Sequence, residues 1–561
     1  MKKYFNKTIL ISAAVIMISV VTTAFISRNE STDFKLQKNM DIFYSLIREL
    51  NAFYVDELQP DELFKKTIDD MLSELDPYTT YYPESERDEF TFMTTGKYGG
   101  IGSQIRTDGD YTVLSRIYKD FPADKAGLKA GDILKSVNGR SLKGMPADKV
   151  SDELKGEPGT EINIIIERQG EELEKTLIRK RVAITPVPYY GMLDDKTGYI
   201  RFTNFTQGCS NNVKTALTTL KEKHGAEKII LDVRSNPGGL LNEAVDIVNL
   251  FVGPDNEVVS TKGRVDRFDN THKTSKKAVD KDIPLVVMIN QATASAAEIV
   301  AGAIQDLDRG VVVGQRSFGK GLVQISRPLS YNATLKVTTA EYYIPSGRCI
   351  QAIDFSLRNE DGSIGYIPDS LTSEFTTRKG RIVKDGGGIS PDYSVETTQL
   401  SQFSSVLYGR SLIFDFATDY YWQNAEIEEP GTFSLSDQSY QRFGNFLEER
   451  DFSYESATEN ALDELKEVAK KEKYYKNNKS LFDTMEKNLV HKLENDLELF
   501  RDEVTRLLED EIIGRYYYEE GLIKHSLQYD RQVGRALEII NDAGLYSSTL
   551  EGTSGLLSIK N

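Results

Sequence analysis

Cysteine and histidine are scarce in this chain, and their placement excludes several kinds of site. The 561 residues include two cysteines and four histidines. Two cysteines cannot form a disulfide framework, and Cys209 and Cys349 fall in separate predicted elements, so we expect free thiols. No histidine has metal-ligand spacing with another histidine or with a cysteine, so we expect no metal and no cofactor. A histidine-based catalytic triad is also disfavoured, because no histidine lies in a recognisable catalytic sequence context.

Positive charge is in deficit as well. Lysine and arginine number 69 against 86 aspartates and glutamates, which gives a formal net charge of −17. A nucleic-acid backbone is therefore not an expected partner. The apolar fraction of 39% is typical of globular proteins, and 561 residues are too many for one hydrophobic core. We expect about three to five domains.

The chain begins with a basic and then apolar segment. Lys2, Lys3 and Lys7 precede an uncharged run from Ile9 to Ile26. This order predicts export to the periplasm or another extracytoplasmic location, with the lysines left inside. The run exceeds the apolar part of most cleaved signal peptides and is just long enough to cross a bilayer. For residues 1–30, a cleaved signal peptide and a signal anchor in the cytoplasmic membrane both stay open.

Changes in residue pattern divide the rest of the chain into four parts. Residues 31–96 have a mainly helical pattern, residues 97–182 form short strands with glycine turns, and residues 183–397 alternate strands with helices. Residues 398–561 are helical in pattern and carry no catalytic motif. There, apolar residues from Phe482 to Leu508 recur every three or four positions, which predicts one long helix with a buried face. The region is interpreted as a dimerisation element, a lid or an adaptor for a partner.

Ser295 lies at a predicted junction between a strand and a helix. An apolar run from Pro284 to Ile289 precedes it, and a helical pattern runs from Ala296 to Leu307. A helix N-terminus offers unpaired N–H groups and partial positive charge, which suits the stabilisation of an oxyanion. Most serines in this position are simply helix N-caps, so the residue alone does not decide between the two roles.

Lys320 and Gln324 follow in a glycine-rich segment. The stretch from Gly314 to Gly321 nearly matches a phosphate-cradling loop, but Gly321 stands where that motif needs Ser or Thr. A lysine acts as a general base only when it is neutral, and burial beside apolar groups such as Phe318 would lower its pKa. Gln324 is suited to orient the amine, because its amide adds no negative charge.

Three segments together resemble the carboxyl-terminal processing (tail-specific) serine proteases. Their order along the chain is also that of the family: Asp232–Gly239, Ala294–Ala303 and Ser317–Gln324. The resemblance extends over about residues 35 to 395. It implies that Ser295 is the nucleophile, Lys320 the general base and Gln324 the residue that positions the base. It further implies an oxyanion hole formed by the N–H of Ala296 and that of Gly238 or Gly239.

Residues 97–182 resemble a PDZ domain, on the residues from Tyr98 to Gly102 and the glycine turns that follow. In such domains a glycine-rich loop binds the terminal carboxylate of a peptide that adds as a strand. The resemblance places Gly100, Ile101 and Gly102 in that loop. Protein or peptide substrates with accessible C-termini are the expected partners.

The expected fold is multidomain, of mixed α+β and α/β class. It comprises an N-terminal helical segment, a β-sandwich-like PDZ domain, a βαβ-type protease core with a crotonase-like sheet, and a C-terminal helical domain. The expected function is cleavage of exported proteins near C-terminal or unfolded segments through an acyl-enzyme. A non-catalytic PDZ adaptor that only binds tails is the alternative from another functional class.

Overall fold

The computed structural model describes residues 32–358, 364–489 and 492–553. The chain divides into two compact units at the boundary between Glu74 and Leu75. The apolar run predicted to direct export lies outside the described residues. Within those residues, no helix combines the length and the apolar character that a bilayer span requires.

The first unit contains two described helices, α2 (Thr32–Phe53) and α3 (Pro60–Ser73). Pro60 occupies the first helical position of α3, where its missing N–H costs no hydrogen bond, and acidic residues follow in the first turn. Phe43 and Phe64 join the two helices through an edge-to-face contact with ring centroids 6.0 Å apart. The helical pattern predicted for this region is confirmed.

The PDZ segment forms an antiparallel sheet with the strand order β3-β4-β5-β7-β8. Its elements are β3 (Ser103–Asp108), β4 (Tyr111–Ile117), α5 (Pro122–Lys125), β5 (Ile133–Val137), β6 (Arg140–Ser141), α6 (Ala147–Leu154), β7 (Glu161–Arg168) and β8 (Glu171–Ile178). β2 (Lys97–Gly100) pairs with β9 (Lys180–Ala183) and brings both ends of the segment together. Strand β3 is an edge of the main sheet, so one side of its backbone is unpaired within the described strands.

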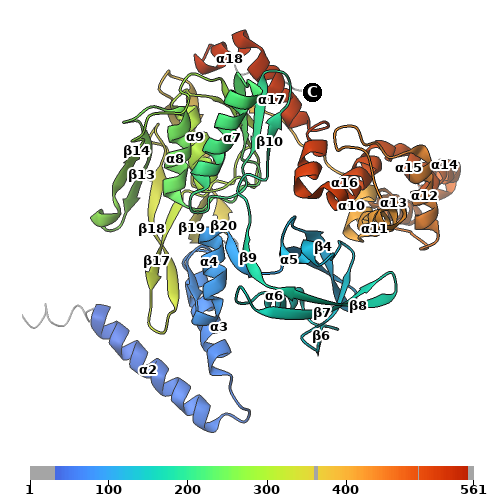
Figure 1. Cartoon of the computed structure of the whole chain (residues 1–561), viewed down its shortest axis with the longest axis horizontal. Coiled ribbons are helices and arrows are strands. Elements are labelled where there is room, and N and C mark those ends of the chain that lie inside the picture. The colour runs from blue at the N-terminus through green and yellow to red at the C-terminus, as the bar shows by residue number, and fades with distance from the viewer. Residues whose placement is uncertain (1–31, 359–363, 490–491, 554–561) are drawn as a thin grey trace, which may run out of the picture. The chain divides into compact units, whose positions relative to one another are not determined.

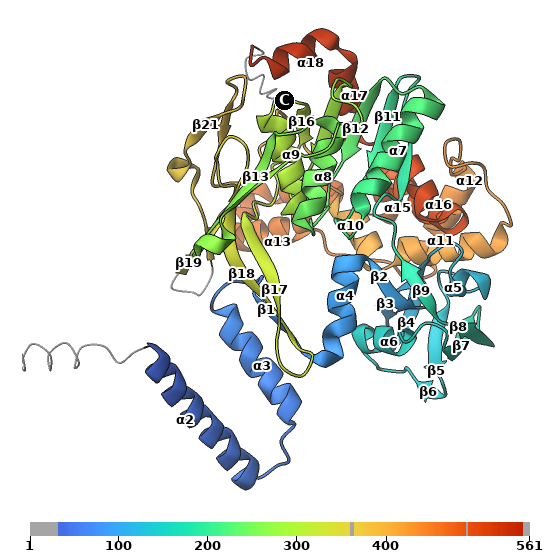
Figure 2. The ribbon, with the colours of Figure 1, turned by 60° about the vertical axis from the view of Figure 1, so that its left-hand side comes forward.

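The region expected to be the protease core, referred to below as the core, is built on a six-stranded sheet with the order β10-β11-β12-β15-β16-β23. All neighbouring strands are parallel except the pair β10 and β11. The strands are β10 (Tyr189–Met192), β11 (Thr197–Arg201), β12 (Lys228–Asp232), β15 (Leu285–Ile289), β16 (Val311–Gly314) and β23 (Tyr393–Ser394). One face is covered by α7 (Cys209–His224), α8 (Leu241–Phe251) and α9 (Ala296–Asp306), as Figures 1 and 2 show. The βαβ pattern expected for the core is present.

The opposite face of this sheet is covered by the last two helices of the described residues, α17 (Arg531–Asn541) and α18 (Ala543–Leu550). Val533, Ala536, Ile539 and Ile540 of α17 pack against core side chains such as Val286, Met288 and Val313 in one buried cluster. The strands are thus buried on both sides, which explains their continuous apolar sequences. The C-terminal region therefore supplies one layer of the core.

A second sheet has the order β1-β18-β13-β14, and β17 pairs with residues 334–341 of β18, on the side of that strand opposite β1 and β13. Its strands are β1 (Thr80–Tyr82), β13 (Glu257–Gly263), β14 (Asn270–Lys273), β17 (Leu322–Pro328) and β18 (Thr334–Tyr343). Small hairpins pair β19 (Ile353–Arg358) with β20 (Ile364–Tyr366) and β21 (Glu374–Thr376) with β22 (Ile382–Lys384). The segment after Pro77, in the region with a mainly helical pattern, contributes the strand β1 before α4 (Arg87–Thr95).

The prediction of one long helix from Phe482 to Leu508 is wrong. That stretch contains α14 (Lys479–Leu489), α15 (Leu493–Leu499) and the start of α16 (Arg501–Ser526). Lys492 has extended dihedrals before α15, and Phe500 leaves helical geometry before α16. Phe482 packs with Leu462 and Ala469, whereas Val504 and Leu508 belong to a different cluster. The apolar spacing continues across the breaks because each helix buries its own face.

The other helices of the C-terminal region are α10 (Gln402–Gly409), α11 (Leu412–Gln423), α12 (Asp437–Glu448) and α13 (Ala457–Lys471). Helices α10, α11 and α12 form a separate aromatic-rich cluster with α16, whereas α13 packs against α14 through Leu462, Ala469 and Phe482. The described part of the region thus contains three packing units: the aromatic cluster, the pair α13 and α14, and the layer on the core sheet.

Substitution of Ile539 by alanine tests the role of α17 as a core layer. Ile539 is fully buried against the sheet, so we expect a stability loss of about 2–5 kcal/mol and a lower thermal midpoint in calorimetry. Gly534→Ala on the same helix is the control, since a methyl group there meets no atom within 4 Å. That variant should be neutral or slightly stabilising. Equal midpoints for both variants would contradict the packing.

Candidate active site

Ser295 stands between strand β15 and helix α9 with an unusual backbone conformation. Its dihedrals are φ 57° and ψ −119°, outside the regions that serine normally occupies. Strained turns of this kind present a nucleophile at the end of a strand in other hydrolase folds. The next N–H, that of Ala296, has no hydrogen-bond acceptor in the described part of the chain.

The turn after β12 packs directly against this serine. A Cβ atom on Gly238 would lie 2.8 Å from Ser295 Cβ and 2.8 Å from Ala296 N, and the φ of Gly238 is 90°. Only glycine fits there. The N–H of Gly238 donates to Asn236 Oδ1 at 2.9 Å, whereas the N–H of Gly239 meets no acceptor among the described residues.

Lys320 lies in the loop between strands β16 and β17. Its Nζ is 4.0 Å from the ring centroid of Tyr78. Burial, reinforced by the positive charge of Lys336, lowers the pKa of Lys320 to about 8, while Asp76 and Glu298 act in the opposite direction. Tyr78 provides the aromatic cover that sequence assigned to Phe318, which is 38% exposed. A strand follows this loop, whereas a phosphate-cradling loop leads into a helix.

The described residues contain no hydrogen bond between Ser295 Oγ and Lys320 Nζ, but their two loops are joined by Glu298. Its carboxylate accepts the N–H of Ser295 at 2.7 Å and that of Lys320 at 2.9 Å. Ser317 Oγ and the N–H of Gly319 donate to its other oxygen at 2.5 and 2.7 Å. Burial raises the pKa of Glu298 to about 7. The four hydrogen bonds favour the carboxylate and so act to lower this pKa, but burial has the larger effect.

Glu298 was missed in the sequence, although a signal was available. Ser295 and Glu298 have the spacing of a capping box, in which the acidic side chain accepts the N–H of the N-cap residue. Tyr342 provides a further connection that sequence did not reveal. Its hydroxyl lies within hydrogen-bond distance of the carbonyl oxygens of both Ser295 and Lys320.

Gln324 points to a different partner from the one expected. Its Nε2 donates to Thr338 Oγ1 at 3.1 Å, and Thr338 Oγ1 in turn donates to Asp76 Oδ1 at 3.2 Å. Within residues 32–358, 364–489 and 492–553, no hydrogen bond joins Gln324 to Lys320. Asp76 also accepts the N–H groups of Tyr78 and Thr79, both at 2.8 Å, and so fixes the turn that places Tyr78 over Lys320.

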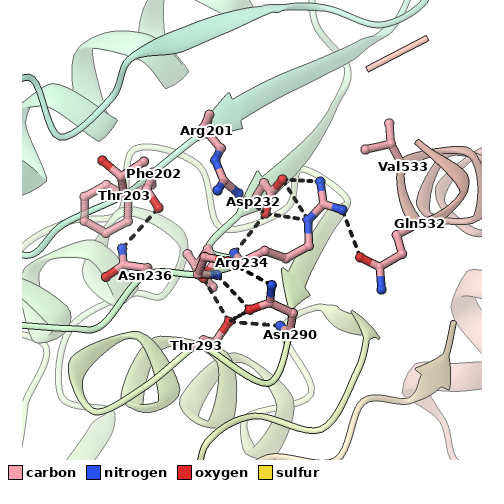
Figure 3. A network of polar contacts seen from close by, with 12 residues as sticks. Arg201, Phe202, Thr203, Asp232, Arg234, Asn236, Asn290, Thr293, Gln532 and Val533 are labelled. Carbon is pink, nitrogen blue, oxygen red and sulfur yellow. Dashed lines mark hydrogen bonds and ion pairs between the residues drawn. The ribbon is translucent and has the colours of Figure 1, made fainter. Parts of the chain in front are cut away.

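Asp232 and Arg234 fix the start of the glycine turn (Figure 3). Asp232 is fully buried and accepts hydrogen bonds from Tyr199 Oη at 2.6 Å and from the guanidinium of Arg234. Arg201 Nη1 lies 2.8 Å from its Oδ1. Burial alone would raise the pKa of Asp232, but the two guanidinium groups hold it well below its ordinary value. The strand end is therefore anchored by a charged group that stays ionised.

The predicted peptide-binding loop lies at one end of the PDZ sheet. Gly100 ends β2, Ile101 is buried in the domain core, and Gly102 has a φ of 81° just before the edge strand β3. The N–H groups of Ile101 and Gly102 meet no acceptor in the described segments.

Both cysteines are free thiols, Cys209 buried and Cys349 partly buried. Among the described residues, no group of three or more histidine, cysteine, aspartate or glutamate side chains is arranged to bind a metal ion.

Comparison with protein families finds three matches along the chain. Residues 196–357 match peptidase family S41, residues 113–168 match the PDZ domain, and residues 403–540 match the C-terminal helical domain of a probable PDZ-protease. The protease core, the PDZ sheet and the C-terminal helices are thus each similar to a known family.

Individual curated relatives match more than half of the chain. The carboxy-terminal-processing protease of Bartonella bacilliformis is 33% identical over 360 residues, which cover 62% of this chain and 80% of that protein. A probable CtpA-like serine protease of Staphylococcus aureus is 33% identical over 350 residues, 61% of this chain and 68% of that protein.

Solved structures give weaker likenesses. The photosystem II D1 C-terminal processing protease is 27% identical with a TM-score of 0.35, over 63% of this chain and 86% of that one. The PDZ domain of a Vibrio cholerae carboxy-terminal protease in complex with peptide is 22% identical with a TM-score of 0.15, over 16% and 99%. Because the chain is 33% identical to a curated relative and covers 80% of its length, it belongs to the carboxy-terminal-processing proteases of peptidase family S41 and is a serine-type peptidase.

Proposed function

We propose that the protein is an exported endopeptidase that cleaves proteins near C-terminal or unfolded segments through a Ser295–Lys320 dyad. The observation that carries the proposal is that one buried carboxylate, Glu298, accepts the N–H groups of both dyad residues. The lysine pKa of about 8 supports a base that is partly neutral near physiological pH.

In the proposed reaction, neutral Lys320 takes the proton of Ser295 Oγ as this oxygen attacks the scissile carbonyl carbon. The carbonyl oxygen becomes an oxyanion, for which the N–H groups of Ala296 and Gly239 are suited because neither has another acceptor among the described residues. Collapse of the tetrahedral intermediate breaks the C–N bond, and Lys320 returns its proton to the leaving amine. Lys320 then takes a proton from water, which attacks the acyl-enzyme carbonyl carbon. When the C–O bond to Ser295 breaks, Lys320 returns this proton to Ser295 Oγ, so that the carboxylic acid is released and both residues regain their starting state.

The PDZ domain is proposed to bind the substrate tail. The unpaired side of β3 is available for strand addition, and the N–H groups of Ile101 and Gly102 are available for a terminal carboxylate. Gly100 shapes the same loop, since a Cβ there would lie 2.7 Å from the ring of Tyr98. Gln324 is proposed to act through Thr338 and Asp76, which position Tyr78 beside the base.

Ser295→Ala and Lys320→Ala should each abolish cleavage of casein, because each removes one partner of the proton transfer. Casein cleavage followed on gels measures this, with circular dichroism to verify folding. Ser436→Ala is the matched control: Ser436 caps helix α12 and accepts the N–H of Ser439. It should cost about 1 kcal/mol of stability and no activity. Full activity of either dyad variant would exclude this mechanism and favour the adaptor alternative.

The kcat/KM of the wild type should rise with pH through about pH 8, because only neutral Lys320 accepts a proton. Lys336→Met removes a positive charge that disfavours protonated Lys320, so the pKa of Lys320 should rise. The acidic limb of the profile, in which kcat/KM rises with pH, should then move to higher pH. Lys223→Met, an equal charge change at an exposed position of α7, should leave the limb in place. A limb unmoved by Lys336→Met would argue against Lys320 as the base.

Amidation of the C-terminus of a peptide substrate should raise its KM, since the amide loses the charge that the PDZ loop is proposed to bind. The increase should be about tenfold with little change in kcat, as expected for one charge-assisted interaction. Initial rates for matched free-acid and amide peptides measure it. Equal KM values would show that the tail carboxylate is not recognised.

A further inference from the structure

Arg234 connects the glycine turn beside Ser295 with the C-terminal helix α17. Its Nη1 donates to Gln532 Oε1 at 2.9 Å and lies 2.7 Å from Asp530 Oδ2. The side chain of Arg234 is 14% exposed, so solvent screens these contacts only in part. Figure 3 shows Gln532 reaching from its helix toward the guanidinium.

Both partners of Arg234 are themselves held in place. Asp530 is the N-cap of α17, where its Oδ1 accepts the N–H groups of Gln532 at 2.9 Å and Val533 at 3.1 Å. Gln532 is 2% exposed, and its Nε2 donates to the carbonyl of Val395 at 2.8 Å. The geometry that these residues impose on Arg234 is therefore fixed by helix α17 and by the chain that follows β23.

The other edge of the Arg234 guanidinium binds Asp232. Nη2 donates to Oδ2 at 2.6 Å and Nε to Oδ1 at 3.0 Å, while the backbone N–H of Arg234 also donates to Oδ1 at 2.9 Å. One carboxylate thus binds both the side chain and the backbone of Arg234. A displacement of the guanidinium would disturb the backbone at the residue where the turn begins.

Hydrogen bonds join the residues that follow Arg234 to the loop that contains Ser295. Ser235, with a φ of 56°, donates its N–H to Asn290 Oδ1 at 2.7 Å. The N–H of Ala294 donates to the carbonyl of Asn236 at 2.9 Å. Two residues further on, Gly238 lies so near Ser295 that a Cβ atom on it would be 2.8 Å from Ser295 Cβ. The path from α17 to the serine thus consists of hydrogen bonds, this close approach and the backbone of the turn itself.

We propose that Asp530 and Gln532 are positioning residues that act through Arg234 on the turn Ser235–Gly239. The inference rests on the proposed function, in which that turn supplies an oxyanion donor. It assigns to the C-terminal region a role in transition-state stabilisation in addition to its packing. The packing itself is carried by apolar residues of α17, whereas these two polar groups converge on a single arginine nitrogen.

Asp530→Asn in the full chain isolates the contact with Arg234. Asparagine is as good an N-cap as aspartate, so helix α17 is retained while the charge facing Arg234 is lost. Asp542→Asn is the matched control, because Asp542 caps α18 by accepting the N–H of Leu545. Gln532→Met removes the other contact with Arg234 at similar side-chain length.

We expect Asp530→Asn and Gln532→Met each to lower kcat on a peptide substrate about tenfold, since small misplacements of oxyanion donors have effects of this size or larger. KM should stay within about twofold, because the turn acts on the transition state. A peptidyl boronic acid, which forms a tetrahedral adduct with a serine, should lose about the same factor in affinity. The thermal midpoint of Asp530→Asn should equal that of Asp542→Asn.

Unchanged kcat and boronate affinity in both variants would overturn the positioning role. So would a fall in kcat that follows the thermal midpoint and also occurs in Asp542→Asn, since that pattern reports destabilisation only. Ser295→Ala separates the two proposals. If it retains cleavage, the proposed function fails. If it abolishes cleavage while Asp530→Asn and Gln532→Met behave as wild type, only the positioning role fails.

Discussion

The candidate site depends on one buried carboxylate. Glu298 has no exposed surface and accepts four hydrogen bonds, three from backbone N–H groups and one from Ser317. A buried carboxylate is costly unless its oxygens are satisfied, so these donors and the acid stabilise one another. Because the donors come from the serine junction and from the lysine loop, satisfying Glu298 fixes the separation of two segments that are distant in sequence. The strained backbone of Ser295 is maintained by the same contacts.

The environment of Lys320 balances opposite requirements. In the proposed role of general base, Lys320 must be neutral when it acts, and burial and the charge of Lys336 disfavour the ammonium form. The proposed mechanism also forms protonated lysine, which Asp76, Glu298 and the face of Tyr78 favour. A pKa of about 8 suits the proposal, because it lets the amine both accept and return a proton near that pH.

Sequence predicted the parts of the site that depend on local pattern. The strand and helix around Ser295 follow from an apolar run and a helical pattern, whereas Asp232–Gly239 and the loop Gly100–Gly102 were expected from the resemblance to known families. Glu298 carried a local signal as well, in the capping-box spacing. The partners of Gln324, the cover of Lys320 by Tyr78 and the contact of Arg234 with Gln532 join residues that are distant in sequence, so no local pattern encodes them. The prediction of a single helix from Phe482 to Leu508 was wrong for a related reason. Apolar spacing does not reveal where a chain turns from one hydrophobic cluster to the next.

The C-terminal region contacts both the PDZ domain and the protease core. Helix α16 leaves helical geometry at Tyr518, with φ 57° and ψ −157°, and there the tyrosine hydroxyl donates to Asp124 of the PDZ domain at 2.8 Å. Arg106 of the PDZ edge strand donates to Ser411 at 2.5 Å. The same region continues into α17, which covers the core sheet and binds Arg234. Since a non-glycine residue with such dihedrals is costly, the kink at Tyr518 is maintained by its surroundings, and the PDZ contact is part of them. The helical region therefore supports both the PDZ domain and the glycine turn, whose positions depend on the same helices.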